Sequence, residues 1–196
     1  MNDPITIEDA RALMHEWVDS DALRIHMEAV ACCMGAYAET VEPGQQDRWR
    51  IAGLLHDFDY QKHPTTEEHP FVGVTFLRER GGVDEEILEA ILGHAEYSGT
   101  PRTTQMAHHL FAVDELAGFL VACCKVRPNG IADLAAKSVK KKLKIENFAA
   151  GCDRRDIREG MEALGLDPTE HIQRCIDALR RDGDRLGLNP STNTPH

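Results

Sequence analysis

Helix-forming segments separated by short breaks constrain this chain more than any other feature. Within each segment, apolar residues recur at helical spacing, which predicts one buried face per helix. In the second segment that face comprises Leu23, Met27, Val30, Met34 and Tyr37. The breaks are rich in proline or glycine, and they lie at residues 43–44, 81–82, 98–101 and 128–130. No run alternates apolar and polar residues as a β-strand does, so the sequence predicts an all-α fold.

Nine helices are predicted from these segments. Asp167 followed by Pro168 marks the start of the last one, because proline fits the first helical position. The length of 196 residues suits a single domain, which we place at residues 1–188. The polar tail, residues 189–196, is predicted to be disordered. The predicted helices cover about residues 6–18, 21–42, 46–56, 69–79, 84–94, 104–125, 131–142, 153–164 and 168–186.

The net charge of −11 restricts the partners of the chain. Polymeric nucleic acid and anionic membranes both favour a basic surface, so we expect neither as a partner. No uninterrupted apolar stretch approaches the roughly 20 residues of a membrane helix, and the N-terminus lacks a signal-peptide pattern. We therefore expect a cytoplasmic protein. The lysine-rich run 137–144 is interpreted as a solvated helix face, with an electropositive rim that attracts phosphate as the alternative.

The six cysteines do not follow a zinc-binding or disulfide pattern. No C-x-x-C motif occurs. Four cysteines form adjacent pairs in apolar helical segments, at 32–33 and 123–124, while Cys152 and Cys175 stand alone. We interpret all six as buried thiols that act as small apolar side chains.

Four polar side chains lie on helix stripes that should face the core. His26, His56, His94 and Asp114 each share a helical face with apolar residues of their own segment. Asp57 follows His56 directly. An isolated ionised aspartate that faces a core costs several kcal/mol. A shared metal ion would satisfy all of these groups, and helical bundles commonly build such sites from facing helices.

The order of these residues resembles that of the HD superfamily of metal-dependent phosphohydrolases. The defining motif of this superfamily is a histidine, then a histidine–aspartate pair, then an aspartate. It corresponds here to His26, His56-Asp57 and Asp114. The local sequences GLLHD at 53–57 and VDEL at 113–116 are similar to the typical contexts of the motif.

This resemblance implies a fold and a cofactor. It covers about residues 21–125, which would form the metal-binding core of an HD-type helical bundle, with about 131–188 as a C-terminal helical extension. Histidine and carboxylate ligands suit one or two divalent ions of Mn, Fe, Co, Ni or Zn, and Mg also fits. The implied metal ligands are His26, His56, Asp57 and Asp114.

Two further histidines extend this ligand set. Dinuclear members of the superfamily bind a second metal with two histidines between the HD pair and the last aspartate, and His69 and His94 lie in that interval. For His69, a solvent-exposed helix start is an equal alternative. His94 faces inward and either binds metal or contacts phosphate as a cation. The catalytic candidates are therefore Asp57, which would orient or deprotonate the attacking water, and His94. Asp59 is interpreted as a local cap or as a partner of a ligand.

The favoured function is hydrolysis of a phosphoester in a small phosphorylated metabolite or nucleotide. An HD-type di-iron oxygenase would use the same six residues and is the first alternative. A catalytically silent, metal-stabilised binding module is the second. The oligomeric state is left open by the sequence.

Several other polar residues have local interpretations. Glu96 and Tyr97 are expected to line the pocket. His108 and His109 begin the long helix and are expected to be exposed. Surface positions are also expected for His15, His63, His171 and His196. The candidates for neutralising a phosphate near the site are Arg102, Lys125 and Arg127.

Overall fold

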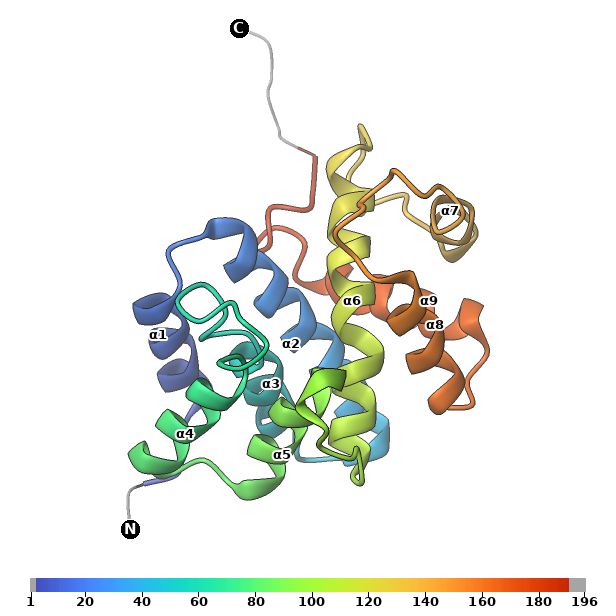
Figure 1. Ribbon diagram of the computed structural model, residues 1–196. Coiled ribbons are helices and arrows are strands. Elements are labelled where there is room, and N and C mark those ends of the chain that lie inside the picture. The colour runs from blue at the N-terminus through green and yellow to red at the C-terminus, as the bar shows by residue number, and fades with distance from the viewer. Residues whose placement is uncertain (1–2, 191–196) are drawn as a thin grey trace, which may run out of the picture.

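The computed structural model describes residues 3–190, which form α-helices and one short 3-10 helix, with no β-strand among them. The prediction of an all-α fold is confirmed. Figure 1 shows the helices in chain order from blue to red. They are α1 (Ile7–Trp17), α2 (Asp21–Val41), α3 (Gln46–Leu55), α4 (Phe71–Arg80), α5 (Glu85–His94), the 3-10 helix η1 (Glu96–Ser98), α6 (Gln105–Lys125), α7 (Ala136–Lys142), α8 (Arg154–Ala163) and α9 (Pro168–Arg181).

Three helix boundaries differ from the prediction. His69 lies in a turn before α4, where its N–H donates to the carbonyl of Thr65, and the helix begins only after Pro70, because the residue before a proline disfavours the helical conformation. Helix α7 begins at Ala136 rather than at 131, since the Asp133 carboxylate accepts hydrogen bonds from side chains of the preceding turn instead. Helix α9 ends at Arg181 rather than at 186.

Helix α6 lies in the middle of the bundle (Figure 1). It contacts α2, α3, α5, α7, α8 and α9, and most of its side chains are buried. Among the described residues, α6 is long and apolar enough to cross a membrane, but 72% of its apolar window is buried inside the protein. Its apolar composition therefore matches its place in the core.

Helices α2 and α3 approach each other closely at Gly53. A Cβ atom at this position would lie 2.7 Å from both the Cα and the N of Ala31 on α2. Close-packed interiors do not accommodate such a contact, so a larger residue would push the two helices apart. Because His26 lies on α2 and His56 directly follows α3, Gly53 helps to bring two predicted ligands together.

The C-terminal helices cover the other side of α6. Helix α8 packs on α6, and α9 packs on α2 and α7. The apolar stripe predicted for the last helix is buried, as expected. Its residues are Ile172, Ile176, Leu179 and Leu186. One cluster of buried apolar side chains extends from Ile5 to Leu188.

The cysteines and the tail follow the predictions in part. All six thiols are free, and five are buried, whereas Cys152 is only half-buried. In the predicted tail, Asn189 donates a hydrogen bond to Asp184. Residues 191–196, including His196, lie outside the described residues.

Two histidines that were predicted to be exposed lie in the interior, so those predictions were wrong. His171 is 1% exposed, and its Nε2–H donates to the carbonyl of Ala112 while its Nδ1 accepts from the Tyr37 hydroxyl. His109 is buried and packs against the rings of Tyr37 and Trp49. Partners on α2 and α6 satisfy His171, and the Nδ1–H of His109 donates to the carbonyl of Gln105, one turn earlier on α6. His15 is exposed, and His63 and His108 are half-buried.

The burial of His171 should make stability depend on pH. Burial lowers the pKa of His171 from 6.5 to about 4, so between these values the unfolded chain binds a proton that the folded chain excludes. We expect the free energy of unfolding to fall by about 3 kcal/mol from this residue as the pH drops from about 6.5 to 4. Urea unfolding at several pH values measures this. His171→Leu should lose this part of the pH dependence, and an unchanged profile in the variant would contradict the assignment.

Candidate metal centre

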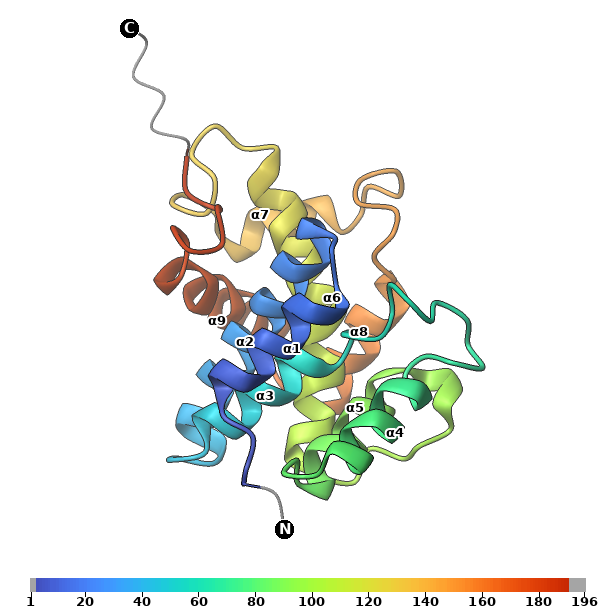
Figure 2. The same cartoon turned by 90° about the vertical axis from the view of Figure 1, so that its left-hand side faces the viewer.

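The six predicted ligand residues converge between α2, α3, α5 and α6. His26 lies on α2, His56 and Asp57 directly follow α3, and Asp114 lies on α6. His94 is the last residue of α5. His69 reaches the same place from the turn before α4, within the connection that Figure 2 shows as an extended loop at the edge of the molecule. The imidazoles of His56, His69 and His94 are almost completely buried.

The first group of ligand atoms has the spacing of a metal site. The Nε2 atoms of His26 and His56 are 3.1 Å apart, and they lie 3.0 and 3.3 Å from Asp114 Oδ1. Asp57 Oδ2 lies 3.5 and 3.4 Å from the same two nitrogens. Ligands about 2.1 Å from a metal are about 3.0 Å apart at right angles and about 3.4 Å apart at tetrahedral angles. These four atoms therefore fit around one ion.

A second group lies on the other side of the Asp57 carboxylate. The Nε2 atoms of His69 and His94 are 3.3 Å apart. Asp57 Oδ1 lies 3.3 Å from the first of these nitrogens and 3.4 Å from the second. Asp57 thus presents one oxygen to each group, so it could be a ligand to an ion on either side.

The ring protons of the histidines support this arrangement. The Nδ1–H of His56 donates to the carbonyl of Gly53 at 2.8 Å, and that of His94 donates to the carbonyl of Ile91 at 2.5 Å. The Nδ1–H of His69 donates to Asp59 Oδ1 at 2.7 Å. With Nδ1 donating in this way, each ring directs its Nε2 toward the centre, and nitrogens this close need positive charge between them, from bound protons or from a metal ion.

Asp59 fixes the position of His69. Its carboxylate is 1% exposed, and its Oδ2 accepts the N–H of Gly73 at 2.7 Å while its Oδ1 accepts from His69. A Cβ atom at Gly73 would lie 2.8 Å from Asp59 Oδ2, so only glycine leaves room for this contact. The interpretation of Asp59 as a partner of a ligand matches this geometry.

The electrostatics of the centre favour positive charge. Burial would lower the pKa of His26, but hydrogen bonds with Asp114 and Asp57 outweigh burial and raise the pKa to about 9. The pKa of His69 is likewise raised to about 9, because Asp57 and Asp59 outweigh its burial. Against the effect of burial, the His56 charge and the neighbouring histidines hold the pKa of Asp57 well below its usual range. The centre therefore attracts either protons or a metal ion, and metal binding should release protons.

The centre opens into a cleft of about 800 Å³. Tyr60, Tyr97 and Phe111 supply aromatic walls, and Glu96 and Tyr97 line the cleft as predicted. Burial and the nearby Asp114 carboxylate raise the pKa of Glu115 in this cleft to about 7.

The C-terminal extension forms one wall of the cleft, which the sequence did not predict. Asp153, Arg155 and Asp156 come from the start of α8, and Cys152 precedes them. Arg155 is the single arginine or lysine among the described residues that line the cleft, and it forms an ion pair with Glu96. In the sequence, the α8 residues of this wall were marked only by a dense run of charges at 153–156, which is far from the HD motif.

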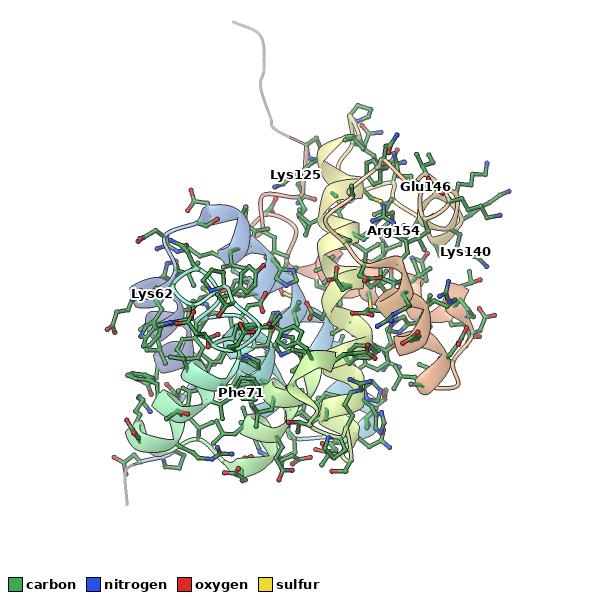
Figure 3. The ribbon with its side chains drawn as sticks, in the orientation of Figure 1. Lys62, Phe71, Lys125, Lys140, Glu146 and Arg154 are labelled. Atoms are coloured by element: carbon green, nitrogen blue, oxygen red, sulfur yellow. The ribbon has the colours of Figure 1, made fainter. Side chains whose placement is uncertain are left out.

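The cations proposed from sequence do not line the cleft, although Arg102 borders it through a 3.8 Å ion pair with Glu96. Arg102 stacks on Phe111 and donates to the carbonyl of Gly93, and Arg127 pairs with Asp133. Neither of them, nor Lys125, lines the cleft. The lysine-rich run 137–144 lines a separate surface hollow, and Figure 3 shows Lys140 on α7 at the outside of the molecule.

Comparison with known proteins agrees with this site. A family model described as HD domain matches residues 23–148, which is more than half of the chain. The chain belongs to the HD domain family. No match to a curated protein or to a solved structure accompanies this result. The HD domain match begins close to the start of the predicted core, at 21, and extends beyond its predicted end, at 125.

Membership of the HD domain family supports metal-dependent, hydrolase-type activity in general. Within the described residues, clusters of histidine and aspartate at this site have the spacing to hold a metal ion. The HD dipeptide itself, His56-Asp57, belongs to these clusters.

The contact between Asp59 and His69 predicts a selective loss of metal affinity. Asp59→Ala removes the group that orients His69, so the affinity for any ion bound at His69 and His94 should fall by about 10- to 100-fold. Calorimetric titration of the metal-stripped protein with Mn²⁺ or Zn²⁺ measures this. Glu67→Ala, which changes an exposed carboxylate in the same loop, should have no effect. Equal weakening at both sites in Asp59→Ala would contradict the assignment.

Proposed function

We propose that this protein is a metal-dependent phosphohydrolase that cleaves a phosphoester of a small phosphorylated metabolite or nucleotide. The observation that carries the proposal is the position of Asp57, whose two oxygens face two separate groups of ligands at the floor of an open cleft. Paired metal ions about 3.5–4 Å apart suit the displacement of a phosphoryl group.

The proposed chemistry divides between the cofactor and the chain. Bound divalent metal would polarise a phosphoryl oxygen and supply hydroxide from water at neutral pH. Asp57 would orient the attacking water and accept its proton. His94 has its ring held by Ile91, with Nε2 directed at Asp57 and His69. We therefore assign His94 to the second ion, in preference to a phosphate contact.

The charges around the cleft limit the classes of phosphorylated substrate that fit it. Four carboxylate residues line it, and its single arginine already pairs with one of them. An extended polyphosphate chain would meet repulsion from these groups. The cleft favours a phosphomonoester with a single phosphate and a compact organic group that contacts the aromatic walls. The four carboxylate residues, apart from the candidate metal ligands, are Glu96, Glu115, Asp153 and Asp156.

This charge pattern predicts a substrate preference. With Mn²⁺ present, kcat/KM for small phosphomonoesters, including nucleoside monophosphates, should exceed that for the corresponding triphosphates by about tenfold or more. Release of phosphate across a panel of metabolites measures the preference. A clear preference for triphosphates would contradict the proposed role of the acidic cleft, even if hydrolysis occurs.

Arg155 should affect substrate binding more than chemistry. Arg155→Gln removes the single arginine or lysine among the described residues that line the cleft, so KM should rise by about 3- to 30-fold with kcat little changed. Steady-state kinetics on the best monoester measure both constants. Arg158→Gln is the matched control, because Arg158 is exposed on the same helix and does not line the cleft. A fall in kcat at constant KM would contradict a binding role.

A di-iron oxygenase is the second candidate function. The same six ligand residues would hold two irons, and the low positive charge of the cleft also suits a substrate without a phosphate. Metal analysis of the purified protein distinguishes the two functions. Two irons per chain together with substrate-dependent oxygen consumption would contradict the phosphohydrolase proposal. Stabilisation by metal with no turnover of any kind would instead favour a silent binding module.

A further inference from the structure

A second, smaller cavity lies between α1, α2, α3 and the segment after α9. Its volume is about 150 Å³, and none of its lining residues lines the metal cleft. Three arginines from three different parts of the chain line it, together with two carboxylates and one thiol. These residues are Arg11, Arg50, Arg185, Glu28, Asp182 and Cys32.

Two of the arginines are already paired. The buried Glu28 carboxylate accepts from Arg11 Nε at 2.6 Å and from Arg185 Nη1 at 2.5 Å. Asp182 accepts from Arg185 Nε at 3.4 Å and from the Cys32 thiol at 3.2 Å. These contacts engage both carboxylates of the cavity.

The third arginine, Arg50, has no such partner. Within residues 3–190 its guanidinium makes no hydrogen bond and no ion pair within 4 Å, and it interacts with Asp182 at longer range. Three guanidinium groups face two carboxylates, which leaves one net positive charge beside the cavity. A half-buried arginine without a directly bonded anion loses solvation, and a longer-range attraction to Asp182 does not replace the lost hydrogen bonds.

The path of Arg50 into the cavity depends on a glycine in the middle of α2. A Cβ atom at Gly35 would lie 2.4 Å from Arg50 Nε and 3.0 Å from its Cγ. Glycine inside a helix is less favourable than alanine by about 1 kcal/mol. Gly35 is therefore unfavourable for the helix, but it leaves the space through which the Arg50 side chain reaches the cavity.

We propose that this cavity binds one small tetrahedral oxoanion, such as inorganic phosphate or sulfate, with Arg50 as its main anchor. The fork of N–H donors in a guanidinium matches two oxygens of such an anion. A cavity of about 150 Å³ accommodates an inorganic oxoanion but not a nucleotide. The bound anion would connect α1, α2 and α3 with the 182–188 segment, and so would stabilise the two helices that position His26 and His56.

Titration of the metal-loaded protein with phosphate and with sulfate, in a buffer free of both, tests this proposal. The wild type should bind an anion and show a higher melting temperature, and Arg50→Gln should weaken that binding by about tenfold or more. Any phosphate bound at the metal centre should be unaffected by this change. Similar affinities for phosphate and sulfate support recognition of a tetrahedral oxoanion, and a preference for phosphate identifies the ligand further.

Matched variants separate the anion site from general effects on charge or folding. Arg181→Gln removes an exposed arginine near the same segment and should leave anion binding unchanged. Gly35→Ala keeps every charge but displaces Arg50, and it should weaken binding as Arg50→Gln does. If Arg50→Gln folds poorly, Gly35→Ala provides the same test. Unchanged anion affinity in Arg50→Gln or in Gly35→Ala would overturn the proposal. Anion density in crystals only at the metal centre would also overturn it.

Discussion

The Asp57 carboxylate is the group on which the rest of the structure depends. It lies between two pairs of histidines, with one oxygen toward His26 and His56 and the other toward His69 and His94. So many acceptor atoms with so little exposure are stable only around positive charge. The raised pKa values of His26 and His69 have the same cause, because a bound proton also supplies positive charge beside the carboxylates. The proposed pair of metal ions would supply this positive charge to all six residues at once.

The packing of the bundle can be understood as support for this centre. Gly53 allows α3 to approach α2, and Gly73 leaves room for the Asp59 carboxylate that binds the His69 ring. Helix α6 carries Asp114 through the core and contacts both halves of the bundle. The glycines therefore determine distances between ligands, although they contact no substrate. Substitution at either glycine would act on the centre through backbone position.

The sequence allowed prediction of the fold class and of the elements that carry the ligands, because helical periodicity shows which residues face inward. His26, His94 and Asp114 stand on such stripes, and the structure places them together. His69 was predicted at the start of a helix but lies in the turn before it, so periodicity could not show that it is buried, and the resemblance to dinuclear members suggested its role as a ligand. His171 lies one turn before the buried Cys175, so a signal was present. Its burial was missed because its partners, Tyr37 and Ala112, are distant in sequence.

The wall of the cleft shows a second limit of sequence reasoning. Arg155 and Glu96 meet only because α8 packs on α6, and no local pattern encodes that contact. The acidic character of the cleft likewise appears only when distant segments are brought together. The sequence therefore predicted the metal centre better than the surroundings that would select a substrate.

Anomalous diffraction from crystals grown with Mn²⁺ or Zn²⁺ tests the central claim most directly. The account predicts two anomalous peaks about 3.5–4 Å apart, on either side of the Asp57 carboxylate. One peak should lie against His26, His56 and Asp114, and the other against His69 and His94. A single peak at full occupancy, or two peaks with Asp57 bound to only one of them, would contradict it.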